Sequence, residues 1–401
     1  MIPVARRAAA IQYAIRDVVV PATALEAEGH EILKFNIGDP LAYPGLPTPD
    51  HMIRAYASAL ENQVNGYGPS YGIPELRAAI AASEQGKTNG GWSCRPEDVY
   101  VTAGVTEALN LLFAAVLEPG DVVLSPGPHY PPYLAYPQLY GARTVEYRLD
   151  PEEGWRIDLD DLASKLDQSV RLLVLIDPNN PTGSVLRPEE VDAVMTLASD
   201  HPNLIVVADE IYDGLDFTGQ RVSIASRAKQ VPVVTLNGVS KVYFAPGWRL
   251  GYLALHDPDG RLSAIRDGLE RLLRARLCPP TPAQAGYLAA LEGPKDWMEA
   301  HRTRVLGQRN RCMERIASIE GIDAHRPGGA FYLFMRITHP KYASDDRSFV
   351  LDLLHQEHVL LVHGSGFSPT HGVGHARLVF LPPLEVIDEA FDRIDRFLSR
   401  I

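Results

Sequence analysis

Short, continuous apolar segments that end in Pro, Gly, Asn or Asp turns constrain the fold of this chain most strongly. They alternate with helical patterns and comprise Val99–Thr102, Asp121–Ser125, Arg143–Glu146, Arg171–Ile176, Leu204–Ala208, Val233–Leu236 and Tyr252–Leu255. Strands rich in Val and Leu, without polar alternation, are buried on both faces, as in a parallel sheet covered by helices. The sequence therefore predicts an α/β fold with a large, mostly parallel sheet.

The remaining residues predict a second, smaller unit. After a helix at Arg261–Leu277, the pattern predicts a helix from about residue 295, strands at Gly329–Met335, Val359–Val362 and Ala376–Phe380, and helices at Asp345–Glu357 and Glu385–Leu398. A chain of 401 residues is long enough for two domains. We predict a large domain at residues 46–290 and a small α+β domain at residues 291–401. Residues 1–45, an arm and a short helix followed by a strand at Glu31–Ile37, would complete the small domain.

Charge and cysteine content indicate which kinds of partner and which cellular compartment to expect. A formal net charge of -12 argues against nucleic acid or an anionic membrane surface as the main partner. The N-terminal apolar residues are interrupted by Arg6, Arg7, Arg16 and Asp17, so neither a signal peptide nor a membrane anchor is expected. The widely spaced Cys94, Cys278 and Cys312 favour a reducing compartment, and we expect the cytoplasm. The 13 histidines follow no metal-binding pattern, so no metal is expected.

The segment from Ser240 to Gly251 places a lysine and an arginine eight residues apart around a Pro-Gly break. Lys241 supplies an amine that becomes nucleophilic when burial or a neighbouring cation lowers its pKa. Arg249 supplies a charged fork for a phosphate. An exposed pair around a turn is the alternative, but the apolar and aromatic residues between the two charges argue against it.

A second candidate for anion binding follows the first main strand. Gly104, Val105 and Thr106 open a predicted helix, Thr106–Leu117, where backbone N–H groups and a hydroxyl can bind an anion. Thr106 could instead be an ordinary N-cap. Together with Arg249, phosphate binding is the favoured interpretation.

Polar side chains also follow two other strands. Asp209 prolongs a buried run and therefore needs a cationic partner, such as a protonated ring nitrogen; a helix N-cap is the alternative. Glu210 is expected to be a helix-start charge. Asn180 lies between two prolines, which can hold its amide rigidly toward a ligand, although a plain polar turn has the same composition.

Aromatic residues and one further arginine complete the candidates. Tyr130 stands in a Pro-rich segment and can stack on a flat ring. Tyr67 lies on a loop before a helix and can donate to a phosphate. Arg377 begins an apolar strand and has the bidentate geometry that recognition of a substrate carboxylate requires. Each could also be structural: a packed tyrosine, a loop tyrosine or a salt-bridged arginine.

Together these groups meet the requirements for holding pyridoxal phosphate. Nearly end to end, the chain resembles the fold type I pyridoxal-phosphate aminotransferases of class I/II, and among them the alanine aminotransferases. The residues that carry the resemblance are Asn36–Pro40, Tyr67–Arg77, Thr102–Ala108, Asn179–Gly183, Asp209–Tyr212, Ser240–Gly251, Arg276–Gln284, Gly329–Phe331 and Val362–Phe367. The resemblance implies an aspartate-aminotransferase-like fold with a seven-stranded main sheet.

The resemblance also implies a role for each candidate. Lys241 would form the Schiff base with the cofactor and act as both base and acid, Asp209 would keep the ring nitrogen protonated, and Tyr130 would stack on the ring. Asn180 and Tyr212 would donate to the 3′-oxygen of the ring. The cofactor phosphate would be held by Gly104, Val105, Thr106, Ser240 and Arg249. Arg377, Asn180 and the Gly38 backbone would bind the substrate carboxylate.

Two details bear on the assembly and on the phosphate site. Tyr67 would reach the phosphate of a neighbouring subunit, which implies a homodimer with active sites at the interface. Gly238 stands where many relatives carry a serine, so one phosphate hydroxyl is missing and a backbone N–H could substitute for it.

The implied reaction is ping-pong transfer of the amino group of an L-amino acid, alanine first, to a 2-oxo acid such as 2-oxoglutarate. Aromatic, branched or acidic donors are alternatives, as is another pyridoxal-phosphate reaction on the same fold, such as a C–S lyase or a synthase. A transcription regulator with an aminotransferase-like domain is a fourth. It would need an N-terminal DNA-binding domain, for which we expect no room before Asn36.

Overall fold

The computed structural model describes residues 2–9, 11, 18–88 and 92–400; Arg16 and Asp17 of the predicted arm lie outside them. Within these ranges the main sheet has eight strands in the order β2-β9-β8-β7-β6-β3-β4-β5. They are β2 (Val99–Thr102), β3 (Val122–Gly127), β4 (Arg143–Asp150), β5 (Arg156–Ile157), β6 (Val170–Ile176), β7 (Ile205–Asp209), β8 (Val233–Gly238) and β9 (Gly251–His256).

This sheet is mostly parallel, as predicted. β4, β3, β6, β7 and β8 run in one direction, and β9 runs antiparallel to its neighbours β8 and β2. The difference from the expected seven strands is β5, whose two residues pair antiparallel with the end of β4. A strand of two residues carries no periodic signal, so the sequence could not predict it.

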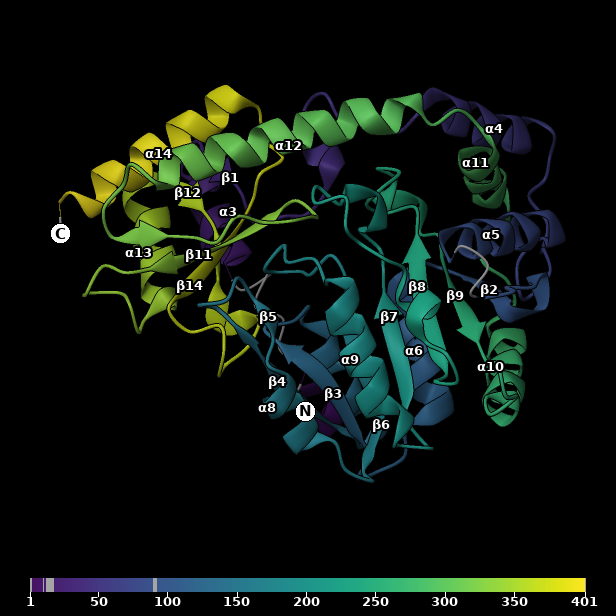
Figure 1. The fold of residues 1–401 in the computed structure, drawn as a ribbon. Coiled ribbons are helices and arrows are strands. Elements are labelled where there is room, and N and C mark those ends of the chain that lie inside the picture. Colours follow the sequence, from purple (N-terminus) through teal and green to yellow (C-terminus); the bar gives the residue numbers. More distant parts are fainter. Residues whose placement is uncertain (1, 10, 12–17, 89–91, 401) are drawn as a thin grey trace.

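Each face of the main sheet is covered by helices. Val206 points into a cluster with Val191 of α9 (Pro188–Ser199), whereas the next residue, Val207, points into a second cluster with Leu109 of α6 (Val105–Val116). The two valines face opposite sides because side chains alternate between the two faces of a strand. Both are nevertheless fully buried. Figure 1 shows α9 in front of the sheet and α6 behind it. Burial on both faces explains why the strands lack polar alternation.

A smaller antiparallel sheet of four strands forms in the described C-terminal part, in the order β10-β11-β14-β13. These strands are β10 (Ile322–Asp323), β11 (Tyr332–Ile337), β13 (Val362–His363) and β14 (His375–Val379). The N-terminal segment reaches this region, because β1 (Leu33–Lys34) pairs parallel with β12 (Val359–Leu360). This pairing fits an N-terminal contribution to the smaller unit; the domain limits themselves stay a prediction.

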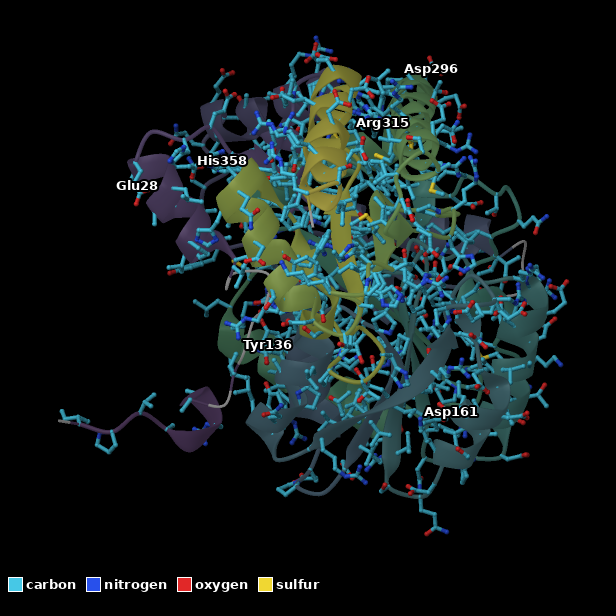
Figure 2. All side chains as sticks on the ribbon, turned by 90° about the vertical axis from the view of Figure 1, so that its left-hand side faces the viewer. Glu28, Tyr136, Asp161, Asp296, Arg315 and His358 are labelled. Atoms are coloured by element: carbon cyan, nitrogen blue, oxygen red, sulfur yellow. The ribbon has the colours of Figure 1, made fainter. Side chains whose placement is uncertain are left out.

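The other helices frame the two sheets. They are α1 (Arg6–Ala9), α3 (Val19–Ala27), α4 (Asp50–Glu61), α5 (Pro74–Lys87), α7 (Pro132–Ala135), α8 (Leu159–Lys165), α10 (Ser263–Arg276), α11 (Thr281–Glu292), α12 (Asp296–Ile316), α13 (Asp346–Glu357) and α14 (Leu384–Leu398). Figure 1 shows α12 crossing the top of the molecule from α14 toward α4 and α11. In Figure 2, Arg315 of α12 and His358, which follows α13, lie above Tyr136, which follows α7, and Asp161 of α8. None of the described helices is long and apolar enough to cross a membrane.

Candidate active site

A cavity of about 750 Å³ lies between the carboxyl ends of the main strands and the small sheet. Its lining includes Val19, Val20, Thr23, Ile37, Gly38, Asp39, Val105, Thr106, Tyr130, Asn180, Asp209, Tyr212, Ser240, Lys241, Pro246, Arg249, Tyr332 and Arg377. All of the residues predicted for the site line the cavity, except Gly104 and Tyr67. The structure thus brings together side chains from nearly the whole length of the chain.

Strand order explains this convergence. β3, β6, β7 and β8 are parallel neighbours, so their carboxyl ends meet at one edge of the sheet. Asp209 is the last residue of β7, and Tyr130, Asn180 and Ser240 follow β3, β6 and β8 within a few residues. Each side chain therefore needs only a short turn to reach the same cavity.

Lys241 presents a half-buried amine to the cavity. Its Nζ donates a hydrogen bond to the Gly38 carbonyl oxygen at 2.6 Å. Burial lowers the pKa of Lys241 to about 8; Asp39 opposes this shift, while Arg377 and Arg249 add to it. A substantial neutral fraction near physiological pH gives the amine nucleophilic character.

Asp209 is a buried carboxylate held by a residue that the sequence analysis did not identify. The Tyr133 hydroxyl donates to Oδ2 of Asp209 at 2.7 Å. Burial raises the pKa of Asp209 to about 6, and the hydrogen bond from Tyr133 opposes the rise. The carboxylate is therefore ionised at neutral pH but poorly solvated, and a cation in the cavity would stabilise it. The one available signal for Tyr133 was its place three residues after Tyr130.

The N-terminus of α6 and Arg249 form a cationic end of the cavity. Gly104 caps the helix at a φ of 84°, and a Cβ there would lie 2.6 Å from an Arg249 guanidinium nitrogen. Arg249 itself adopts a left-handed φ of 52° and donates to the Pro246 and Ala103 carbonyls at 2.9 and 3.4 Å. Among the described residues no carboxylate forms an ion pair with it. Val105 and Thr106 add the N–H groups of the first helical turn, so this end suits a phosphate.

Gly238 is excluded from carrying a side chain by the strand next to it. A Cβ at this position would lie 2.6 Å from the Leu250 carbonyl oxygen and 2.7 Å from the Cα of Gly251. Gly238 and Gly251 are paired across β8 and β9. The serine that many relatives carry here would therefore clash with backbone in this chain.

Arg377 lies on β14 and is 2% exposed. Its guanidinium donates to the Asn180 side-chain oxygen at 3.0 Å and to the Asn36 carbonyl at 2.6 Å. The guanidinium carbon also lies 4.6 Å from the ring centroids of both Tyr332 and Phe367. Because the oxygen of Asn180 accepts from Arg377, its amide nitrogen is the group that it can offer to a ligand.

The two remaining predicted tyrosines differ in position. Tyr212 is buried at the cavity, and its hydroxyl is 2.7 Å from that of Tyr332. Tyr67 lies outside the cavity with its side chain 87% exposed. Tyr67 therefore cannot act in the site of its own chain in this conformation, and its role stays a prediction about a neighbouring subunit.

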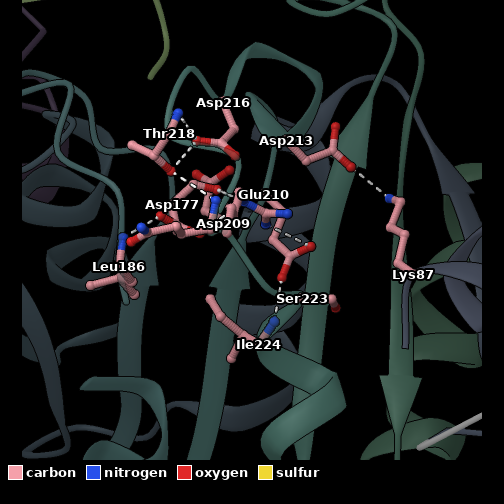
Figure 3. A network of polar contacts seen from close by, with 12 residues as sticks. Lys87, Asp177, Leu186, Asp209, Glu210, Asp213, Asp216, Thr218, Ser223 and Ile224 are labelled. Atoms are coloured by element: carbon pink, nitrogen blue, oxygen red, sulfur yellow. Dashed lines mark hydrogen bonds and ion pairs between the residues drawn. The ribbon is translucent and has the colours of Figure 1, made fainter. Parts of the chain in front are cut away.

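Behind the cavity, a second group of charged residues is paired within the protein (Figure 3). Glu210, expected to be a helix-start charge, instead forms an ion pair with Arg221 at 2.9 Å and accepts from the Ile224 N–H at 2.7 Å. Arg221 also pairs with Asp177 at 2.8 Å, and Lys87 pairs with Asp213 at 2.7 Å. The helix-start prediction for Glu210 was wrong, because two turn residues follow it and a three-residue 3-10 helix begins only at Asp213.

The residues around the cavity fit pyridoxal phosphate. The group needs an amine for its aldehyde, an anion site for its phosphate and an acid beside its ring nitrogen. Lys241, the cationic end at Arg249 and Asp209 provide these three from different sides of one cavity.

Comparisons with known proteins identify the family. The family model for aminotransferase class I and II matches residues 30–394. A glutamate-pyruvate aminotransferase of Haemophilus influenzae is 38% identical over 94% of this chain and 92% of its own length. An alanine aminotransferase structure from Pyrococcus furiosus has a TM-score of 0.96 and 44% identity with complete coverage of both chains. A Thermus thermophilus aspartate aminotransferase double mutant has a TM-score of 0.88 and 31% identity, covering 99% of this chain and 100% of its own. The chain therefore belongs to the class I and II aminotransferases, a family that uses pyridoxal phosphate.

Proposed function

We propose that this chain is a pyridoxal-phosphate-dependent alanine aminotransferase that transfers the amino group of L-alanine to 2-oxoglutarate. The observation that carries the proposal is the likeness, over nearly the whole chain, to proteins described as alanine and glutamate-pyruvate aminotransferases. Aspartate aminotransferases share the fold at 31% identity, so the fold alone does not select the donor.

Lys241 carries the proton chemistry in this proposal. The bound cofactor supplies an electron sink for the substrate carbon that loses its proton. Lys241 would remove the proton from the substrate Cα and deliver it to C4′, the carbon of the cofactor's aldehyde group, for which its lowered pKa is suited. Asp209, ionised and buried, would keep a proton on the ring nitrogen of the cofactor.

The two anionic groups of the reactants have separate binding residues. The cofactor phosphate would be bound by the N–H groups of Val105 and Thr106 and by Ser240 and Arg249. Gly104, which has no side chain, would let the phosphate approach the helix N-terminus closely. Arg377, the Asn180 amide and the Gly38 backbone would bind the substrate carboxylate. Tyr130 would lie on the ring, and Asn180 and Tyr212 would donate to the ring oxygen.

An apolar wall supports a small, uncharged side chain on the donor. Val19 and Val20 of α3 and Ile37 contribute apolar side chains to the cavity lining, with Val20 74% and Ile37 42% exposed in the single chain. An apolar wall discriminates between neighbouring aliphatic side chains by only about 1–3 kcal/mol per methylene. Aromatic and branched donors are therefore the serious alternatives.

A panel of amino donors tests the substrate. The purified enzyme is loaded with pyridoxal phosphate, and the visible absorbance of the cofactor is followed as each amino acid is added without an acceptor. We expect alanine and glutamate to convert the cofactor with the highest kcat/KM. Fast conversion by aspartate or phenylalanine with slow conversion by alanine would overturn the proposed donor and leave the family assignment intact.

We further propose a homodimer in which Tyr67 reaches the neighbouring active site. Ile53 and Leu60 stand seven residues apart on α4 and are 46% and 45% exposed, followed by Val64 at 47% and Tyr67 at 87%. Ile53 and Leu60 lie on one face of α4, and the exposed Val64 and Tyr67 follow the helix, so this segment offers apolar side chains to a second copy.

Mixing two impaired variants, one at Lys241 and one at Tyr67, tests the dimer. In a dimer of a Lys241→Ala chain and a Tyr67→Ala chain, one of the two sites has an intact lysine and an intact tyrosine. We expect activity to return when the two are unfolded and refolded together, and sedimentation to give twice the chain mass. No recovery in a mixed dimer would contradict a role for Tyr67 across the interface.

The compartment is proposed from the thiols. Cys94, Cys278 and Cys312 form no disulfide, and Cys94 and Cys312 are buried. Reduced thiols persist in a reducing environment, so we propose the cytoplasm. Labelling of intact cells with a thiol reagent that does not cross membranes should leave Cys278 unmodified.

A further inference from the structure

Tyr332 lines the active-site cavity from the small sheet and was not among the residues identified from the sequence. It begins β11 and is 2% exposed. In the pairing of β11 with β14, Phe334 stands opposite Arg377, so Tyr332 is the diagonal neighbour of Arg377 on the same face. The side chain therefore belongs to the small sheet but reaches the residues that follow the main strands.

The ring and the hydroxyl of Tyr332 make different contacts. The ring lies against the Arg377 guanidinium, with 4.6 Å between the guanidinium carbon and the ring centroid. The hydroxyl oxygen is 2.7 Å from that of Tyr212, whose ring stands edge-on at a centroid distance of 5.5 Å. One side chain thus touches both the proposed carboxylate-binding arginine and the proposed donor to the ring oxygen.

The same hydroxyl also explains why residue 38 is glycine. A Cβ on Gly38 would lie 2.2 Å from the Tyr332 hydroxyl oxygen. The Gly38 carbonyl accepts the hydrogen bond of the Lys241 amine. Tyr332 therefore stands where the Lys241, Tyr212 and Arg377 contacts meet, and the chain makes room for its hydroxyl.

We propose that Tyr332 is a positioning residue that donates its hydroxyl hydrogen to Tyr212 and holds Arg377 with its ring. A Tyr212 hydroxyl that accepts from Tyr332 directs its own hydrogen at the ring oxygen of the cofactor, and a chain of hydrogen bonds strengthens each member. The ring of Tyr332 keeps the guanidinium in place by a cation–π contact. The proposal rests on the function proposed above.

Removal of the hydroxyl alone tests the first contact. Tyr332→Phe keeps the ring over Arg377 and weakens the donation by Tyr212. A weaker donor stabilises the negative ring oxygen less, which favours the protonated form of the bound cofactor. In the enzyme loaded with pyridoxal phosphate, without substrate, the pH midpoint of the visible absorbance should rise by about half a unit, with KM values within about twofold of the wild type.

Removal of the ring tests the second contact. Tyr332→Leu loses both the hydrogen bond and the cation–π contact. KM for the amino acid and for the 2-oxo acid should both rise, by about fivefold to tenfold, since both carry the carboxylate that Arg377 would bind. The pH midpoint should shift as it does in Tyr332→Phe.

A double variant shows whether Tyr332 acts through Tyr212. If it does, the single variant Tyr212→Phe and the double variant Tyr212→Phe/Tyr332→Phe should have the same pH midpoint. The Tyr212 hydroxyl is already absent in the single variant, so loss of the Tyr332 hydroxyl has no further effect. Independent, additive shifts would overturn the proposed route.

Tyr342→Phe is the matched control. Tyr342 is 1% exposed, and its hydroxyl donates to Asp352 at 2.6 Å in the C-terminal part, away from the cavity. We expect it to lower thermal stability about as much as Tyr332→Phe does, with an unchanged pH midpoint. If Tyr332→Phe behaves like this control, the positioning role is wrong. If the wild-type protein forms no visible band with pyridoxal phosphate, the proposed function fails instead.

Discussion

The carboxyl end of the main sheet carries two groups of charged residues that are used in opposite ways. Asp209 and Glu210 are consecutive, yet Asp209 faces the cavity and Glu210 faces the group behind it. The front group combines Lys241, Arg249 and buried Asp209 with Arg377 of the small sheet, and all four line a cavity of about 750 Å³. The rear group pairs Arg221 and Lys87 with carboxylates at 2.5 to 2.9 Å.

The difference shows how a protein separates charges for ligands from charges for structure. A buried charge without a partner is expensive, so it persists where a ligand supplies the partner. In the front group the amine is made partly neutral and the carboxylate poorly solvated, and both are stabilised when an oppositely charged group enters. In the rear group the protein itself supplies the carboxylates that pair with Arg221, from Asp177 and Glu210.

The largest expected effect is on activity in the front group. Lys241→Ala should lower kcat by about 10⁴-fold or more, because the amine proposed to move the proton is gone. The free energy of unfolding of the cofactor-free protein should stay equal or rise, since a half-buried amine is removed. Assays of turnover and urea unfolding check both. A variant that retains the cofactor–lysine absorbance would contradict the assignment of Lys241.

The rear group should show the reverse. Arg221→Met leaves two buried carboxylates without a cation and should lower the free energy of unfolding by about 3–5 kcal/mol. Arg221→Met with Asp177→Asn and Glu210→Gln removes all three charges and should recover most of that loss. Urea unfolding of the wild type, the single variant and the triple variant measures the free energy of unfolding of each. An equal loss in the neutral triple variant would show that shape, rather than charge pairing, is what the rear group provides.

Tyr133→Phe should have a smaller effect, on the pH dependence of cofactor binding. The hydrogen bond from Tyr133 lowers the pKa of Asp209, so its loss raises that pKa above about 6. Protonated Asp209 cannot pair with a cationic ring nitrogen. The pH below which pyridoxal phosphate affinity falls should therefore move up by about one unit, equivalent to about 1.4 kcal/mol. Titration of the dissociation constant between pH 5 and 8 measures the shift, and an unchanged profile would contradict the role of Tyr133.

The smallest expected effect concerns a carboxylate that belongs to neither group. Burial raises the pKa of Glu146 to about 7, while its hydrogen bond from Ser368 opposes the rise. As pH rises, Glu146 loses its proton in the unfolded chain before it does so in the folded protein. The free energy of unfolding therefore decreases with rising pH until about pH 7. Glu146→Gln does not titrate and should be more stable than the wild type by about 1–2 kcal/mol at pH 8, and equal at pH 4. If the two proteins are equally stable at both pH values, the cost of burying the Glu146 charge is offset by its surroundings, as it is for the carboxylates of the rear group.

Much of the fold followed from local patterns. Continuous apolar runs predicted the main strands within a few residues, and the helix predicted at Glu385–Leu398 is α14, Leu384–Leu398. Most of the residues that line the cavity were predicted as well, because Asp209 ends a strand, Tyr130, Asn180 and Ser240 follow strands closely, and parallel strands end together. Glu210 was misjudged because the same position after a strand serves a helix start, a ligand or an ion pair equally well.

The sequence by itself determined which short segments present an amine, an anion site, a buried acid and a guanidinium, because these depend on residue type and on neighbours a few positions away. Only the tertiary structure decided what lies between those segments. Tyr332 meets Tyr212 across 120 positions, and the approach of Leu250 and Gly251 excludes a side chain at Gly238. Such contacts depend on how distant elements pack, and no local periodicity encodes them.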